Sequence, residues 1–211
     1  MKTGQLIDIL AQGAGPAPSP ATARRLCPAI AVGLVASCAL VLLTRGPLPA
    51  ATFGTAAPWI KLAYAFSLGL AAALLAGQLA RPVASLRSQL IAVAVTFVAM
   101  VSVACLSLLY LPSGLRTAAV LGNTWWMCPW LLLGFSLPAL AAAFWAVRGL
   151  APTRLRAAGF ACGLLSGAVG AAGYSLGCPE SSAAFVAIWY SLGILMTALL
   201  GAALGPRLLR W

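Results

Sequence analysis

The chain has 211 residues, of which 63% are hydrophobic and 7% are charged, with thirteen lysines and arginines, two acidic residues and no histidine. Soluble domains carry about 25% charged residues, so this composition excludes an ordinary water-soluble fold. The absence of histidine excludes histidine-ligated metal sites, serine–histidine triads and histidine proton relays. The net charge of +11 lies mostly in short connections, so we expect it to set membrane topology and expect no direct contact with nucleic acid.

Residues 1–25 are predicted to form a short amphipathic helix followed by a linker. Thr3 is a suitable N-cap, and the apolar residues after it gather on one helical face beside a single acid. The residues of this helix are Leu6, Ile7, Asp8, Ile9 and Leu10. The next stretch, GAGPAPSPATARR, has the composition of a Pro/Ala linker. A tethered helix of this kind either lies on lipid or docks in a groove of a partner protein, and both interpretations are open.

Six apolar stretches of about 20 residues follow, each long enough to cross the hydrocarbon core as a helix. They lack the alternating pattern of barrel strands, and a bilayer requires backbone groups to be satisfied within each segment. The predicted spans are 26–44, 59–80, 90–110, 125–147, 159–177 and 183–204. We therefore predict an all-α polytopic membrane protein, with a six-helix transmembrane domain at 26–205 and a short cytoplasmic C-terminus at 206–211.

The basic residues are distributed unequally between the two sides of this predicted bundle. Ten lie on the side of both termini: Lys2, Arg24, Arg25, Arg81, Arg87, Arg148, Arg154, Arg156, Arg207 and Arg210. Three lie on the other side: Arg45, Lys61 and Arg116. Connections rich in lysine and arginine stay in the cytoplasm, so both termini are predicted to be cytoplasmic.

The fifth predicted span carries glycines at every fourth position. In the stretch GFACGLLSG these are Gly159, Gly163 and Gly167. Small residues four apart lie on one helix face and allow two helix backbones to approach closely. The pattern favours packing within the bundle over a dimer interface.

Two of the six cysteines stand apart from the rest. Cys128 is predicted about one turn into the fourth span from its outer end, and Cys178 lies in the short outer connection between the fifth and sixth spans. Each is followed by proline, which holds the preceding residue at a helix end or turn. Glu180, the only acid after Asp8, lies beside Cys178. The other four cysteines are expected to be apolar filler: Cys27, Cys38, Cys105 and Cys162.

Three interpretations of this outer region remain open from the residues alone. Two thiols and the Glu180 carboxylate could hold a soft metal ion. The two thiols could instead form a disulfide, provided that their Cα atoms come within about 7 Å. In the third interpretation, Cys-Pro-Glu-Ser makes a polar turn in which Glu180 caps the last helix. Sequence spacing does not establish that Cys128 and Cys178 meet.

Several stretches resemble the NrsF-type negative regulators of sigma factor F, which are six-span anti-sigma factors of the bacterial inner membrane. They are MKTGQLIDILA, RRL before the first span, NTWWMCPWLLLGFSLP and, most specifically, CPESSAAFVAIWYSLGI. The resemblance implies a sigma factor of the extracytoplasmic-function type as partner, with the bilayer as surroundings. It also implies release on heavy-metal or oxidative stress sensed by Cys128 and Cys178. No constitutive cofactor is expected, and a soft or heavy metal ion would act as the signal.

The working hypothesis is a membrane-bound anti-sigma factor and not an enzyme, in which residues 6–10 and the short inner loops bind the sigma factor. One alternative is a membrane thiol oxidoreductase, but the sequence has no Cys-x-x-Cys pair. The other is a carrier of small solutes or metals, but the spans have few polar residues or helix breaks at mid-membrane depth.

Overall fold

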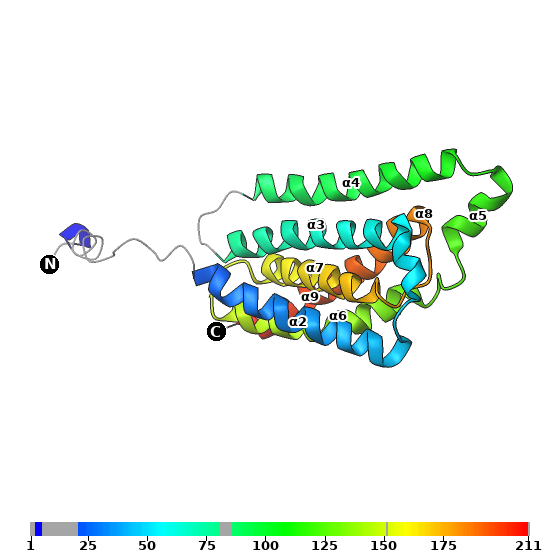
Figure 1. Cartoon of the computed structure of the whole chain (residues 1–211). Coiled ribbons are helices and arrows are strands. Elements are labelled where there is room, and N and C mark those ends of the chain that lie inside the picture. The colour runs from blue at the N-terminus through cyan, green and yellow to red at the C-terminus, as the bar shows by residue number, and fades with distance from the viewer. Residues whose placement is uncertain (1–2, 6–20, 81–85, 151, 211) are drawn as a thin grey trace.

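The computed structural model describes residues 3–5, 21–80, 86–150 and 152–210, and this part of the chain is helical without strands. Six helices are long: α2 (Ala21–Arg45), α3 (Ala56–Leu79), α4 (Arg87–Leu109), α6 (Cys128–Arg148), α7 (Leu155–Tyr174) and α9 (Ser191–Leu208). Four elements are short: the 3₁₀ turn η1 (Ala50–Gly54), α5 (Ser113–Leu121), α8 (Ala183–Phe185) and the π-helical turn η2 (Val186–Tyr190). Figure 1 shows the long helices running side by side.

The prediction of six helices long and apolar enough to cross a membrane is confirmed. The last of these runs continuously through α8, η2 and α9 as Ala183–Leu208. Several boundaries differ from the prediction by three residues or more: α2, α3, α4 and α7 begin earlier, α6 begins later at Cys128, α7 ends earlier, and the last span ends later. The helix α5 was not predicted, because its nine residues mix polar and apolar side chains and are too few for a span.

Helix α7 lies at the centre of the bundle and packs against α9, α6, α3 and α2. Of its most apolar stretch, 78% of the residues are buried, against 11% for α4, which packs on α3 at the edge (Figure 1). The composition explains the difference. Glycine, alanine and serine dominate α7 and let four neighbours approach, whereas α4 is rich in valine and leucine and exposes them.

The contact between α7 and α9 is made largely by backbone, and we call it the glycine seam. A methyl group on Gly163 would lie 2.7 Å from the Cα of Ala198 and would overlap the carbonyl oxygen of Thr197. Gly159 faces Gly201 in the same way, and Gly167 faces the backbone of Ile194. These glycines therefore lie on the face of α7 that packs within the bundle.

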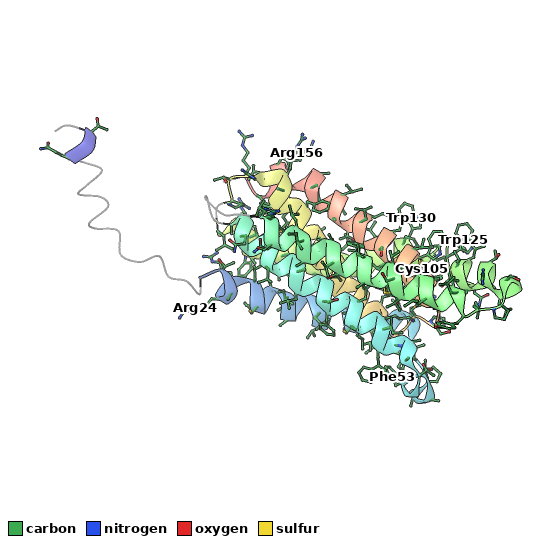
Figure 2. All side chains as sticks on the ribbon, turned by 90° about the horizontal axis from the view of Figure 1, so that it is seen from above. Arg24, Phe53, Cys105, Trp125, Trp130 and Arg156 are labelled. Carbon is green, nitrogen blue, oxygen red and sulfur yellow. The ribbon has the colours of Figure 1, made fainter. Side chains whose placement is uncertain are left out.

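The two ends of the bundle differ in charge. The helices alternate in direction, so α2 begins and α9 ends at the same end, which we call the basic end (Figure 1). Its described cations are Arg24, Arg25, Arg87, Arg148, Arg154, Arg156, Arg207 and Arg210. Figure 2 labels Arg24 and Arg156 at this end and Phe53, Trp125 and Trp130 towards the other. At that other end, the backbone NH of Leu48 donates to the carbonyl of Leu176 at 3.0 Å and joins two connections.

Little of the predicted tail falls within the described residues. Residues 3–5 are helical and exposed. Leu6, Ile7, Asp8, Ile9 and Leu10 lie outside the described part of the chain, as does most of the linker. The proposed role of the tail therefore remains a prediction.

Candidate functional site

Cys128 and Cys178 lie together at the end of the bundle opposite the basic end, which we call the thiol end. Cys128 is the first residue of α6, and not a residue one turn inside it as predicted, while Cys178 lies in the connection between α7 and α8. Both side chains are buried, at 0% and 1% exposure, and both thiols are free. The two thiol groups are close enough to influence each other electrostatically. The fold thus brings together two residues fifty positions apart in the sequence.

Glu180 is directed towards the connection between α5 and α6. Its Oε1 accepts a hydrogen bond from the backbone NH of Asn123 at 2.8 Å and one from Oγ1 of Thr124 at 3.2 Å. It does not cap the last helix, because Ser182 is the N-cap of α8 and its hydroxyl accepts from the NH of Phe185. The carboxylate therefore fastens the turn that follows Cys178 to the turn that precedes Cys128.

Gly122 makes this fastening sterically feasible. Its φ of +58° and ψ of −166° fall in a region that is essentially restricted to glycine. A methyl group here would lie 2.6 Å from Oε2 of Glu180 and 2.7 Å from the ring of Phe185. A residue with a side chain at this position would therefore both strain the backbone and displace the carboxylate.

Lys61 of α3 also lies near Cys128 and Cys178 at the thiol end. Its side chain is 1% exposed, and its Nζ donates a hydrogen bond to the carbonyl oxygen of Cys178 at 2.8 Å. The same Nζ lies 6.0 Å from the ring centroid of Tyr190. It is also close enough to Cys128 for the two groups to interact electrostatically. A buried ammonium therefore lies beside both cysteines.

Two tyrosines complete the cluster. The rings of Tyr174 and Tyr190 are 5.6 Å apart, and Phe135 of α6 packs 5.7 Å from Tyr174. The Tyr190 hydroxyl is buried and, among the described residues, has no hydrogen-bond partner. Cys178 interacts with it electrostatically without the geometry of a hydrogen bond. We call Lys61, Cys128, Tyr174, Cys178 and Tyr190 the thiol cluster.

The π-helical turn η2 links this cluster to the outer surface of the thiol end. It carries Tyr190 into the cluster, while the adjacent Trp189 donates from its indole Nε1 to the carbonyl oxygen of Val120 at 2.9 Å. The Trp189 ring also lies 5.4 Å from that of Trp125. Single π-helical turns inside α-helices are frequent at functional sites. Consecutive residues of one turn therefore contact both the thiols and the helix α5.

The side chains at this site offer few ligands for a metal ion. Within the described residues, no group of three or more histidine, cysteine, aspartate and glutamate side chains is placed to hold a metal ion. The Glu180 carboxylate has hydrogen-bonding partners of its own. What the cluster brings together is two free thiols, two phenols and the amino group of Lys61, all of them buried.

Lys61, Tyr174 and Tyr190 were not predicted from the sequence as members of the site. Lys61 was expected only as one of the three cations on the outer side. One signal was available, since Lys61 is the third residue of the predicted span that begins at residue 59, and ionisable residues within spans are functional candidates. The tyrosines carried no comparable signal.

The fold and the cluster define a class: an all-helical protein with six helices apolar enough to span a membrane and a buried thiol site at one end. Comparison of sequences gives the family, since the family described as "Negative regulator of sigma F" (NrsF) matches residues 10–211. The chain belongs to this family, whose members are regulatory proteins rather than enzymes.

Two curated relatives match the full length. The chain is 42% identical over 215 residues to the "Anti-sigma-F factor NrsF" of Caulobacter vibrioides (strain NA1000 / CB15N), with 100% of both chains covered. It is 36% identical over 213 residues to the "Probable anti-sigma-F factor NrsF" of Azospira oryzae, again with 100% of both covered. No solved structure matches this chain.

Proposed function

We propose that this protein is a membrane-embedded anti-sigma factor of the bacterial inner membrane. It retains a sigma factor of the extracytoplasmic-function type and releases it when Cys128 and Cys178 register heavy-metal or oxidative stress. The observation that carries the proposal is the burial of both thiols in one cluster, at the end of the bundle opposite the one from which the tail departs. Family membership supports the regulatory role.

The surface of the bundle supports insertion in a bilayer. Large apolar side chains are exposed along α4, among them Val95, Val98 and Leu106, each more than half exposed. In water such a helix face would be an aggregation hazard, whereas in lipid it is a solvated surface. By the positive-inside rule, the basic end faces the cytoplasm and the thiol end faces outward.

Retention of the sigma factor is assigned to the tail and the short loops of the basic end. The apolar face of residues 6–10 would dock in a groove of the sigma factor, as an amphipathic helix does. Deletion of residues 1–20 is therefore expected to abolish co-purification of the sigma factor from native membranes, while the six-helix bundle still inserts and folds. Undiminished co-purification would assign retention to the loops alone and would contradict the role of the tail.

Signalling requires two arrangements of the bundle that differ in their affinity for the stimulus. A shift from 1% to 99% released needs about 5.5 kcal/mol of differential binding or reaction free energy. A covalent or metal–thiolate bond between the start of α6 and the connection after α7 can supply an energy of this size. The stimulus would thereby change how α6, α7 and α9 pack.

The test of the sensory role uses a reporter of the sigma regulon. Strains carrying Cys128→Ser or Cys178→Ser are expected to lose at least about 90% of the induction by cadmium or hydrogen peroxide and still to repress without stress. The matched control is Cys105→Ser, because Cys105 is an exposed cysteine of α4 outside the cluster. Normal induction in both cluster variants would refute sensing by these thiols.

A further inference from the structure

An open pocket of about 490 Å³ lies between α7 and α9 at the basic end. It is lined by Arg156 of α7 and by Ala202, Ala203, Pro206 and Arg207 of α9. Two guanidinium groups therefore border one hollow with an apolar floor, and Figure 2 labels Arg156 at this end of the bundle. The volume falls within the range of about 300–1,000 Å³ that is usual for ligand sites. The sensing and retention proposed above give this pocket no role.

The glycine seam fixes the backbone positions of the two arginines relative to each other. A methyl group on Gly205 would lie 3.2 Å from the Cα of Gly159 and would overlap the carbonyl oxygen of Leu155. Leu155 directly precedes Arg156, and Gly205 lies two residues before Arg207. The pocket is thus bordered by two helices in backbone contact. Binding of a ligand would require little reordering of the backbone.

The positive charge of this pocket has no counterpart in the bundle. The chain has two acids, Asp8 and Glu180, and Glu180 is the one that falls within the described residues. Glu180 lies at the thiol end, where its carboxylate accepts hydrogen bonds from Asn123 and Thr124. The two guanidinium groups therefore have no carboxylate partner in the described part of the chain, and an anion that complements them has to come from elsewhere.

The floor of the pocket continues along α9 as an exposed row of apolar side chains, which we call the apolar stripe. Its members recur three or four residues apart, so they lie on one face of the helix and lead to the pocket: Leu192, Leu195, Leu199 and Ala203, followed by Arg207. The ligand that fits both features is negatively charged at one end and long and apolar beyond it.

We propose that this pocket binds an anionic phospholipid of the cytoplasmic leaflet, with its phosphate held between Arg156 and Arg207 and one acyl chain along the apolar stripe. Guanidinium groups hold phosphate oxygens through paired N–H donors. Basic pockets between membrane helices on the cytoplasmic side suit anionic lipid headgroups. The inference rests on the membrane insertion and orientation of the proposed function and adds a ligand to them.

An acidic segment of a protein partner fits the pocket less well. It would neutralise the two arginines, but it would leave the apolar stripe unoccupied. In the proposed orientation the stripe runs from the cytoplasmic end into the hydrocarbon core, where a water-soluble partner does not reach. A phospholipid carries its phosphate and its acyl chains in one molecule and therefore matches both features.

The test measures lipid binding to the full-length protein by native mass spectrometry in detergent. Phosphatidylglycerol is the anionic probe and phosphatidylcholine, with matched acyl chains, the zwitterionic one. The wild type is expected to bind phosphatidylglycerol at least tenfold more tightly. Arg156→Gln and Arg207→Gln should each weaken that binding roughly fivefold, the share of one arginine near anionic lipid, and the double variant should weaken it at least tenfold.

Two control variants separate the pocket from the general charge of this end. Arg87→Gln removes an exposed arginine of α4 that does not line the pocket, and it is expected to leave phosphatidylglycerol binding unchanged. Ala203→Phe keeps both arginines but fills the floor, and it is expected to weaken binding at least tenfold. Circular dichroism and size-exclusion chromatography check each fold. If the double arginine variant does not fold, Ala203→Phe decides.

The inference is overturned if the two lipids bind equally well, if Arg87→Gln weakens binding as much as the pocket substitutions, or if Ala203→Phe binds like the wild type. Displacement of the lipid by a glutamate-rich peptide at equal concentration would also overturn it and would favour a protein partner. The proposed function is tested separately with phosphatidylcholine vesicles. If the wild type does not insert into them, membrane embedding and the lipid site both fail, whereas insertion without preference for phosphatidylglycerol refutes the site alone.

Discussion

The two ends of α7 make different kinds of contact. Towards the basic end, Gly159 and Gly163 remove side chains so that the backbone of α7 lies directly on that of α9. Towards the thiol end, Tyr174 packs against the rings of Phe135 and Tyr190 and lies beside the two thiols. The end at Gly159 packs through the absence of side chains, whereas the end at Tyr174 also contacts thiols and aromatic rings.

The comparison indicates where the bundle is able to change. Backbone packing in the glycine seam has no group whose charge or oxidation state can alter, so its geometry is insensitive to chemical conditions. The thiol cluster has five such groups, and one of them, the Tyr190 hydroxyl, lacks a hydrogen-bond partner within the described residues. If the thiol cluster rearranges, the glycine seam is therefore expected to keep its geometry.

The largest effect is expected from breaking the glycine seam. Gly163→Leu should destabilise the protein by about 3 kcal/mol or more, since the new side chain would meet backbone, which cannot rotate away. The matched control is Gly134→Leu in α6, where nothing lies within 4 Å of an added Cβ. Unfolding free energies in bicelles provide the measurement. Equal stabilities of the two variants would mean that α7 and α9 are not in backbone contact.

A smaller effect is expected at the thiol end. Gly122→Ala should cost about 2 kcal/mol, through its positive φ and through contact with the Glu180 carboxylate. Gly46→Ala separates the two causes, because Gly46 also has a positive φ, of 75°, but has nothing within 4 Å. It should cost about 1 kcal/mol.

Thermal unfolding of both variants in detergent tests this difference. A second readout is the rate at which a maleimide reacts with Cys128, which should rise in Gly122→Ala as the turn before α6 loosens. If Gly46→Ala were the more damaging change, or if Cys128 reacted at the same rate in both, the contact of Gly122 with Glu180 would not be holding the turn.

The elements that sequence patterns predicted are those that depend on local composition. Six apolar stretches gave six long helices, and the basic residues sort to one end as their order along the chain indicated. The spacing of Gly159, Gly163 and Gly167 marked the packed face of α7. Each of these features repeats within one segment, so a single segment is enough to identify it.

The features that could not be predicted join distant segments. Lys61 contacts a residue 117 positions away, and Asn123 one 57 positions away. No local pattern encodes such pairs, and the sequence left open whether Cys128 and Cys178 meet at all. The π-helical turn η2 was also invisible, because its residues, VAIWY, are as apolar as the regular helix around them.

The π-helical turn η2 carries an intrinsic fluorescence probe. Trp189 and Tyr190 are adjacent residues of η2. The indole of Trp189 donates a hydrogen bond to the carbonyl oxygen of Val120, and Tyr190 lies in the thiol cluster. Because both residues belong to one helical turn, a rearrangement that moves Tyr190 away from the sulfurs also moves the Trp189 indole away from α5. In a variant that keeps Trp189 and replaces the other six tryptophans, the emission spectrum is therefore expected to change when the surroundings of the buried sulfur atoms change.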